Sequence, residues 1–337
     1  MSNANQLTGY STVRDHGAGL IDLASRGRLL VSGSEAVMFL NGLITNDMKT
    51  LAVNSWMPAV FPNVQGRLLA AVRIIHRSDG FLIDTEGATH QTVLKLLERF
   101  TLAGDFRLTD MTGETATLSI QGKNAAEVVR LLFGEMVAKV ERQQVATAQL
   151  ENDSEVTVIR ATHTAEDGFD IFINAGDAET LHESLIKAGS QSIGSEVAET
   201  LRIEAGIPRF GIDMDETNVV TETNLDDAVS FTKGCYIGQE IIVRIKHRGH
   251  VAKKLAGVIF EREASLESGA KIHSVNEQEI GRVTSSSFSP RLDRTVALGY
   301  VKYDYLAPGT KVVASLEDGE EGNVAELPFV RGSWYEN

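Results

Sequence analysis

The stretch around which the chain is organised is Phe231-Thr232-Lys233-Gly234-Cys235-Tyr236-Ile237-Gly238-Gln239-Glu240. Cys235 is the only cysteine, and Lys233 stands two residues before it. The two glycines permit a tight turn with close backbone approach. If a helix begins near Ile237, its positive end and Lys233 both favour the thiolate form of Cys235. The alternative is a small buried cysteine at an ordinary corner between a loop and a helix.

Length and composition indicate a soluble globular protein of two or three domains. The chain has 337 residues, of which 42% are hydrophobic and 23% charged. The net charge of −14 argues against coating of nucleic acid, although it leaves room for a local basic patch. A single cysteine cannot form an internal disulfide, and the polar start of the chain has no apolar signal core. We therefore expect a cytoplasmic protein without membrane association.

Residues before position 250 alternate short apolar runs with single helical patterns. The runs predict strands at residues 19–23, 28–32, 57–64, 68–76, 80–84, 106–108, 115–120, 155–161 and 169–173. Apolar residues at helical spacing predict helices at residues 34–43, with Ser34 as N-cap, 89–100, 178–188 and 195–204, and after Asn124. No G-x-G-x-x-G or Walker motif follows a strand. This mixture is typical of α+β layers rather than of a doubly wound sheet.

The chain changes character after His250. Short β-like runs at residues 255–260, 281–285, 297–301, 311–314 and 323–327 are separated by turn residues, and no clear helix interrupts them. The predicted fold class is therefore α+β layers followed by a C-terminal all-β barrel or sandwich. We expect a first α+β part at residues 1–103, a second α+β part with the cysteine stretch at residues 104–250, and the β domain at residues 251–337.

Residues 233–240 resemble the signature of the YgfZ family of folate-binding proteins. That family is related to the T-protein of the glycine cleavage system, an aminomethyltransferase. Three other segments resemble the family in the same order, namely residues 39–47 with Thr45-Asn46-Asp47, residues 201–206 with Glu204, and residues 281–301. The resemblance covers nearly the whole chain. It implies a T-protein-like folate-binding fold of α+β layers with a C-terminal barrel, and tetrahydrofolate or a derivative as the cofactor.

The resemblance also implies roles for individual residues in folate binding. Glu204 would accept hydrogen bonds from the pterin, because a carboxylate offers two oxygens to paired donors. Arg244 would lie near the folate site. By residue type alone, Glu204 can equally be a solvated glutamate at a helix end, and Arg244 a surface cation.

At the cysteine stretch, the resemblance implies that Cys235 is the functional thiol and that Lys233 tunes it electrostatically. Gln239 and Glu240 would orient the loop or bind the partner group.

One departure separates this chain from the T-protein. In the T-protein an acidic residue follows the glycine turn of the early hairpin and assists aminomethyl transfer. The corresponding positions after Gly66 are Ala70 and Ala71. A methyl group cannot relay a proton. We therefore expect no aminomethyl transfer by the T-protein mechanism, while a folate pocket can persist.

Residues 244–254 are basic within an acidic chain. This segment contains five Lys or Arg and two His. It can hold the glutamate tail of a folate or an RNA phosphate, or it can be a solvated strand edge protected by charge. The lack of interleaved aromatic residues argues against stable RNA binding.

The sequence predicts no permanent metal. A stable iron–sulfur cluster needs three or four thiolates, and the chain has one. Cys235 can supply at most one ligand to a cluster shared with another chain. His247 and His250 are three residues apart without an evident carboxylate partner.

Three hypotheses about function remain open. The first is a non-enzymatic accessory protein that binds tetrahydrofolate and uses Cys235 to support assembly or repair of iron–sulfur clusters. Its partners would be iron–sulfur client enzymes or assembly proteins, including enzymes that modify tRNA. The second is a folate-dependent one-carbon enzyme, aminomethyltransferase-like, with diverged chemistry. The third is a folate-binding scaffold in which Cys235 is inert.

Overall fold

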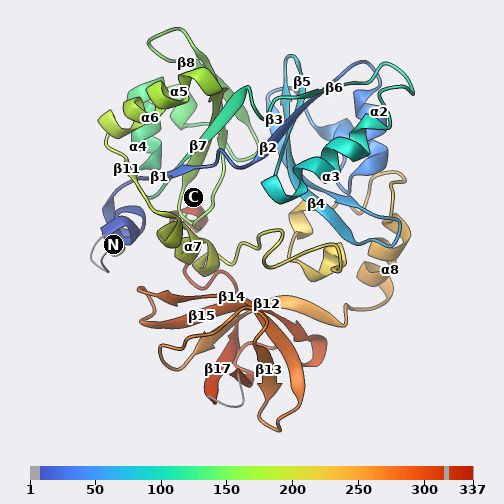
Figure 1. The fold of residues 1–337 in the computed structure, drawn as a ribbon, viewed down its shortest axis with the longest axis vertical. Helices are drawn as coiled ribbons and strands as arrows, with labels where there is room; N and C mark the ends of the chain where they lie inside the picture. Colours follow the sequence, from blue (N-terminus) through green and yellow to red (C-terminus); the bar gives the residue numbers. More distant parts are fainter. Residues whose placement is uncertain (1–7, 315–318, 337) are drawn as a thin grey trace.

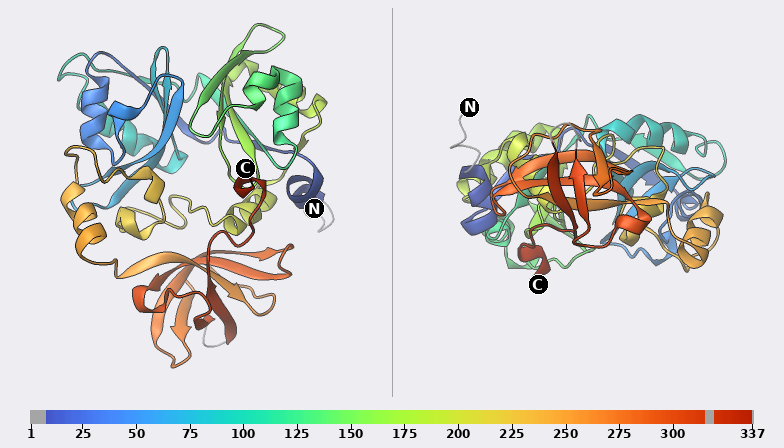
Figure 2. Two further views of the ribbon diagram at one scale, coloured as in Figure 1. Left: turned by 180° about the vertical axis from the view of Figure 1, so that it is seen from behind. Right: turned by 90° about the horizontal axis from the view of Figure 1, so that it is seen from below.

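The computed structural model describes residues 8–314 and 319–336. Two α+β parts lie side by side, and a β-barrel lies across their lower ends (Figure 1). The view from below in Figure 2 shows the barrel in front of both parts. The predicted fold class, α+β layers followed by a barrel, is confirmed.

The first α+β part is a five-stranded antiparallel sheet covered by helices. Its strand order is β3 (Ser55–Pro62), β4 (Leu68–Arg77), β5 (Gly80–Thr85), β2 (Gly27–Ser32) and β6 (Arg107–Asp110). The covering elements are α2 (Ala36–Leu43), η2 (Met48–Thr50) and α3 (Gly87–Glu98). Leu40 and Val93 from the two α-helices share one apolar core with Ile74 of β4. Helix α2 begins at Ala36 rather than at a Ser34 cap, because the Ser34 hydroxyl bonds Asp105 instead.

The second α+β part is a six-stranded sheet. Its order is β11 (Gln191–Ser192), β1 (Gly19–Asp22), β7 (Thr115–Gln121), β10 (Gly168–Asn174), β9 (Glu155–Arg160) and β8 (Val145–Gln149), with only β1 and β11 parallel. The surrounding helices are η1 (Thr12–His16), α4 (Ala125–Phe133), α5 (Glu135–Ala138), η3 (Ala175–Asp177) and α6 (Ala178–Lys187). The apolar faces of α4 and α6 pack on this sheet and form its core.

The two sheets exchange strands across the proposed boundary at residue 103. Strand β1 comes early in the chain but pairs with β7, while β6 comes after residue 103 but pairs with β2. The two parts are therefore joined by sheet pairing as well as by the chain. The boundaries at residues 103 and 250 therefore stay a prediction about which segments fold as units.

The connection between the α+β parts and the barrel contains α7 (Ser195–Glu204), η4 (Val220–Glu222), η5 (Asp226–Ala228) and α8 (Gln239–Arg248). Helix α7 was predicted with the same bounds. The strand-edge interpretation of residues 244–248 is wrong, because these residues belong to α8. Its buried Ile242 packs with Val60 and Leu68 of the first part, which favours a helix over an isolated edge strand.

The C-terminal domain is a closed barrel of six antiparallel strands, which decides between the barrel and sandwich alternatives. The strand order is β12 (Lys253–Phe260), β15 (Arg294–Lys302), β14 (Glu279–Ser289), β13 (Lys271–Ser274), β16 (Lys311–Ala314) and β17 (Glu320–Ala325), and β17 pairs back to β12. Two short elements complete it, η6 (Tyr303–Tyr305) and η7 (Ser333–Tyr335). Within the described residues, no helix is long and apolar enough to cross a membrane.

Candidate functional site: the central cavity and the cysteine loop

The cysteine loop, residues 229–238, is fastened to the segment that contains Thr45-Asn46-Asp47. The Lys233 ammonium donates to the carbonyl oxygens of Asn41, Ile44 and Asn46 at 2.8, 2.9 and 2.6 Å. Lys233 is only 7% exposed, and burial lowers its pKa to about 8. Backbone N–H groups of the loop also donate to residues 42 and 45. Two of the segments that carry the predicted family resemblance are thus in direct contact.

Gly238 is required by the turn that precedes α8. Its φ is +77°, and a β-carbon there would lie 2.4 Å from the Asn63 carbonyl oxygen. The turn of the β3–β4 hairpin also packs tightly on α8, because a β-carbon on Gly66 would lie 3.2 Å from side-chain atoms of both Ile241 and Ile242. A β-carbon on Gly234 would meet no atom within 4 Å. Of the two glycines in the loop, only Gly238 is fixed by close backbone packing.

The thiol of Cys235 is exposed. The expected buried-corner alternative is therefore wrong for this residue. Helix α8 begins at Gln239, so Cys235 lies outside its first turn rather than at a helix starting near Ile237. The Lys233 ammonium donates to backbone carbonyls of the first part, so electrostatic tuning of the thiol stays a prediction.

The other predicted residues of this stretch lie on α8. The Gln239 amide nitrogen is 3.5 Å from the carbonyl oxygens of Lys233 and Gly234, across the loop. Glu240 is exposed in the first helical turn, where the helix dipole favours a carboxylate. Arg244 is exposed one turn later. Their roles in binding a folate or a partner stay predictions.

A central cavity of about 910 Å³ lies where the three parts of the chain meet. The first part contributes residues of β3 and β4, including Trp56 and residues 71–73, and the second contributes residues 161–163 and Ala165. The connection contributes residues 205–208 and 224–228, and the barrel side contributes residues 254–256 and 325–328. The C-terminal residues Trp334 and Tyr335 complete the wall. This volume lies in the range of about 300–1,000 Å³ that is typical of small-molecule pockets.

A buried ionic network forms the floor between the first two parts. Arg73 and Arg26, which both line the cavity, pair with the fully buried Asp84 at 2.7 and 2.8 Å. Arg73 also forms an ion pair with the fully buried Asp170. His163 Nε2 lies 2.9 Å from Oδ2 of the same carboxylate.

Each buried carboxylate of this network is held in its charged form. Burial alone would raise the pKa of Asp84, but Arg26 and Arg73 hold it below its usual range. Burial likewise opposes the charge on Asp170, and His163 and Arg73 lower its pKa well below that range. The network therefore presents two arginines and a histidine to the cavity in fixed positions.

Of the two alanines at the expected acidic positions, Ala71 presents its methyl group to the cavity. Ala71 lines the cavity wall, whereas Ala70 faces the core on the other side of β4. A carboxyl group is nevertheless present on the neighbouring wall. Asp227 of η5, an exposed residue, lines the cavity. Partial removal of its carboxyl group from water, followed by repulsion from Asp226, raises its pKa.

Glu204 lies directly behind the cavity wall. Its side chain is fully buried and accepts hydrogen bonds from Tyr10 Oη at 2.8 Å and from Arg14 Nη2 at 2.6 Å, and a further one from Ser289. The next residues, Ala205 and Gly206, line the cavity. Among the described residues, neither Glu204 nor Cys235 contributes to this wall.

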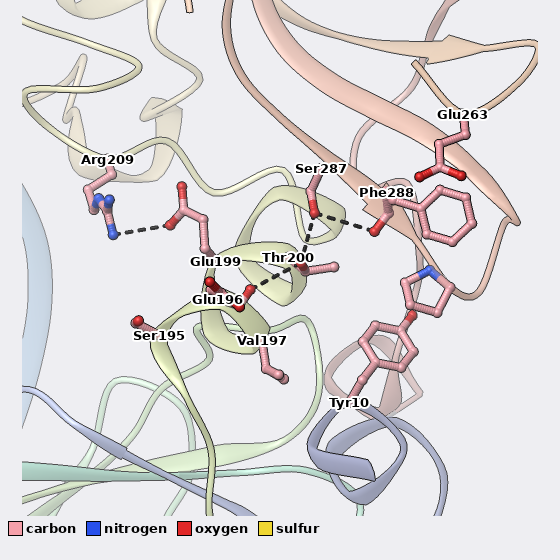
Figure 3. Close-up of a pocket in the computed structure, with 11 residues that line it drawn as sticks. Tyr10, Ser195, Glu196, Val197, Glu199, Thr200, Arg209, Glu263, Ser287 and Phe288 are labelled. Carbon is pink, nitrogen blue, oxygen red and sulfur yellow. Dashed lines mark hydrogen bonds and ion pairs between the residues drawn. The ribbon is translucent and has the colours of Figure 1, made fainter. Parts of the chain in front are cut away.

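A second hollow of about 860 Å³ lies between α7 and the barrel (Figure 3). It is bounded by α7, by Tyr10 and by the tip of the β14–β15 hairpin at Phe288. Glu199 in this hollow pairs with Arg202 and Arg209. Glu204, at the end of α7, lines neither hollow, and its hydrogen bonds join α7 to the N-terminal segment and to the barrel.

Sequence reasoning missed most of the cavity. Arg26, Arg73, His163, Asp227 and Trp334 were not predicted as site residues, and no local motif marks them. The charged residues inside predicted strands were the available signal, because an arginine in a buried strand needs a partner. Within the described residues, no group of three or more His, Cys, Asp or Glu is arranged to hold a metal ion.

Comparison with known proteins accounts for nearly the whole chain. Residues 7–233 match a family profile described as GCVT N-terminal domain, and residues 253–330 match one described as glycine cleavage T-protein C-terminal barrel domain. An aminomethyltransferase of Symbiobacterium thermophilum is 30% identical over 327 residues, covering 93% of this chain and 86% of that protein. An aminomethyltransferase of Rubrobacter xylanophilus is 29% identical over 315 residues, covering 93% and 83%.

The fold comparison agrees with the sequence comparison. The crystal structure of glycine cleavage system aminomethyltransferase T from Bartonella henselae superimposes with a TM-score of 0.85 and 24% identity, covering 97% of this chain and 90% of that one. The relatives are named aminomethyltransferase, so the comparisons confirm the T-protein side of the predicted resemblance, and the YgfZ assignment stays a prediction. The chain belongs to the glycine cleavage T-protein family, with both its GCVT N-terminal domain and its C-terminal barrel domain.

Proposed function

We propose that this protein binds a tetrahydrofolate in the central cavity and transfers a one-carbon unit to it, as an aminomethyltransferase-like enzyme with diverged chemistry. The observation that carries the proposal is a cavity of ligand size formed by all three parts of a T-protein-family fold. The relatives named aminomethyltransferase favour this function over the accessory role that the sequence suggested first.

The proposed chemistry differs from that of the T-protein at the cavity wall. Ala71 leaves no carboxyl group on β4, so a proton must be moved by another group. Asp227 is the candidate, because it lines the same cavity and its raised pKa brings it closer to neutral pH. Glu204 takes part indirectly in this proposal. Its bonds to Tyr10, Arg14 and Ser289 hold the segment that carries Ala205 and Gly206 into the wall.

The test is turnover of purified protein with tetrahydrofolate and an S-aminomethyl donor, which would yield a methylene folate, a free thiol and ammonia without an oxidant. We expect formation of a one-carbon folate that Asp227→Asn lowers at least about tenfold, with tetrahydrofolate affinity within about threefold of wild type. Asp79→Asn is the matched control, because Asp79 is a partly exposed aspartate that pairs with Arg77 at 2.7 Å and does not line the cavity. Binding of tetrahydrofolate without any turnover would contradict the one-carbon proposal and leave folate binding intact.

The accessory role is the second candidate, and the exposed sulfur of Cys235 is the observation that favours it. In that role the protein would bind tetrahydrofolate and use Cys235, in the cytoplasm, to support iron–sulfur clusters of client enzymes, including tRNA-modifying ones. Cys235→Ser should then abolish complementation of cluster-enzyme defects while tetrahydrofolate affinity is unchanged. Normal complementation by Cys235→Ala would instead support a folate-binding protein with an inert thiol.

A further inference from the structure

The loop between β9 and β10 carries a histidine, His163, into the wall of the central cavity. The backbone of this loop is fastened to the buried side chain of Gln121 in β7. The Gln121 amide oxygen accepts a hydrogen bond from the His163 backbone N–H at 2.8 Å, and its nitrogen donates to the Ala161 carbonyl oxygen at 3.0 Å. The backbone of His163 is thus placed by a side chain that does not itself line the cavity.

One nitrogen of the His163 ring is bound by a buried carboxylate. Nε2 lies 2.9 Å from Oδ2 of Asp170, and Arg73 forms an ion pair with the same carboxylate. The lowered pKa of Asp170 keeps this carboxylate charged, and a charged carboxylate can only accept hydrogen bonds. The hydrogen must therefore lie on Nε2 of His163, and in the neutral ring the lone pair lies on Nδ1.

The other ring nitrogen, Nδ1, is accessible at the cavity wall. The His163 side chain is 25% exposed and lines the cavity. Among the described residues Nδ1 of His163 has no hydrogen-bond partner, and it is not buried, whereas Nδ1 of His90 and of His273 is buried without a partner. An imidazole that a buried carboxylate orients, with its free lone pair toward a ligand cavity, has the arrangement of a general base.

The proposed one-carbon transfer has two protons to move. The carbon of an S-aminomethyl donor forms bonds to two folate nitrogens, and its bonds to sulfur and to the amino nitrogen break, with the electron pairs leaving on sulfur and nitrogen. Each of the two folate nitrogens gives up one proton, and these protons end on the thiol and on the ammonia. Asp227 can serve one of these transfers, which leaves the other to a second group in the cavity.

We propose that His163 is this second group. Its Nδ1 accepts the proton that a folate nitrogen loses when that nitrogen bonds the carbon, and returns it to the departing amino group, while Asp227 serves the sulfur. Asp170 is a positioning residue, because it acts through the orientation of the His163 ring. The inference rests on the proposed one-carbon transfer and adds to it the residue that accepts the folate proton.

The first experiment measures turnover of the full chain with tetrahydrofolate and an S-aminomethyl donor. His163→Gln keeps an N–H for Asp170 but has no base, so kcat should fall at least about tenfold with tetrahydrofolate affinity within about threefold of wild type. His90→Gln is the matched control, because His90 Nε2 lies 2.9 Å from Asp110 outside the cavity, and its kcat should be unchanged. An unchanged kcat in His163→Gln would overturn the role of His163 and leave the transfer standing. A wild-type protein without turnover would overturn both.

A second measurement reads the hydrogen position in the wild-type protein and does not depend on activity. In protein labelled with ¹⁵N-histidine, the ring signals of His163 are assigned by their loss in His163→Gln. With the ring neutral, Nε2 should carry the hydrogen and Nδ1 should have the chemical shift of an unprotonated nitrogen. Asp170→Asn should bring the form with hydrogen on Nδ1 into the mixture, because an amide does not require a donor. A wild-type ring with its hydrogen on Nδ1 would contradict the proposal.

Discussion

The cysteine loop takes its residues from one continuous stretch, whereas the central cavity takes its residues from all three parts of the chain. In the loop, a buried lysine and a glycine with positive φ fasten residues 229–238 to the first part and to the β3–β4 turn. In the cavity, arginines, a histidine and two tryptophans meet only after folding. A local motif can thus mark a structural junction, while the chemical surface is assembled from residues without a motif.

The largest expected effect tests the ionic floor of the cavity. Arg73→Met removes the shared partner of two buried carboxylates and should lower the free energy of unfolding by about 3–5 kcal/mol at pH 7. Because the pKa values of Asp84 and Asp170 are lowered in the folded chain, their contribution is present above about pH 4 and is lost as pH falls below it. The free energies of unfolding of the wild type and of Arg73→Met should therefore converge below about pH 4.

The matched control for this prediction lies at the end of the same strand. Arg77 pairs with the partly exposed Asp79 at 2.7 Å, so Arg77→Met should change stability by less than about 1 kcal/mol. Urea unfolding from pH 7 to pH 3 measures both. Equal losses in the two variants would mean that the network is not the stabilising feature proposed.

The next effect tests the cysteine loop as a structural junction. Gly238→Ala adds a β-carbon 2.4 Å from a carbonyl oxygen at a positive φ, and should cost about 2–4 kcal/mol. Gly234→Ala meets open space and should cost less than about 1 kcal/mol. Urea unfolding midpoints of the two variants, compared with that of the wild type, measure this difference in stability. If both substitutions were tolerated alike, the close packing of the loop on the β3–β4 turn would be refuted.

Lys233→Met leaves three carbonyl oxygens without their shared donor and should cost about 2 kcal/mol. The pKa of Lys233 is about 8 in the folded chain and about 10.4 when unfolded. The folded chain therefore releases this proton first, and the wild type gains stability as pH rises from about 8 to 10.5. The difference between wild type and variant should widen over that window. A difference that is constant with pH would contradict the lowered pKa.

The smallest effect belongs to the residue that first drew attention. The Cys235 thiol is exposed, so Cys235→Ala should change stability by less than about 0.5 kcal/mol. Tetrahydrofolate affinity should also be unchanged, because Cys235 is not part of the cavity wall. Calorimetry and thermal melting on one preparation measure both. Weaker tetrahydrofolate binding in this variant would place the thiol in the folate site after all.

Local sequence patterns predicted most of the helices and strands, but not which strands pair with one another in the sheets. Alternation predicted β4 and β14, and spacing predicted α7 with the same bounds. Strand β13 has four residues and β8 is partly exposed, so neither carries enough apolar pattern to be recognised. The exchange of β1 and β6 between sheets depends on pairings distant in sequence, which periodicity does not encode.

The candidate site was predicted less well for the same reason. The resemblance led to Glu204 and Cys235, which lie behind the cavity wall and on the surface, respectively. Arg73 and His163 meet through Asp170, 97 and 7 residues away in sequence, and only the fold brings them together. The sequence did point to Ala71, together with Ala70, through the acidic positions of the T-protein, and to Lys254 as part of the basic segment 244–254; Ala71 and Lys254 both line the cavity.

The most direct test of the central cavity as the folate site is calorimetric titration of tetrahydrofolate into Ala71→Phe. Ala71 is partly exposed on the cavity wall, so the larger ring fills ligand space, whereas a substitution at the buried Ala70 would disturb the core. We predict at least about a tenfold loss of affinity, or about 1.4 kcal/mol, with a melting temperature close to that of wild type. Unchanged affinity in folded Ala71→Phe would show that tetrahydrofolate binds elsewhere and would contradict the account.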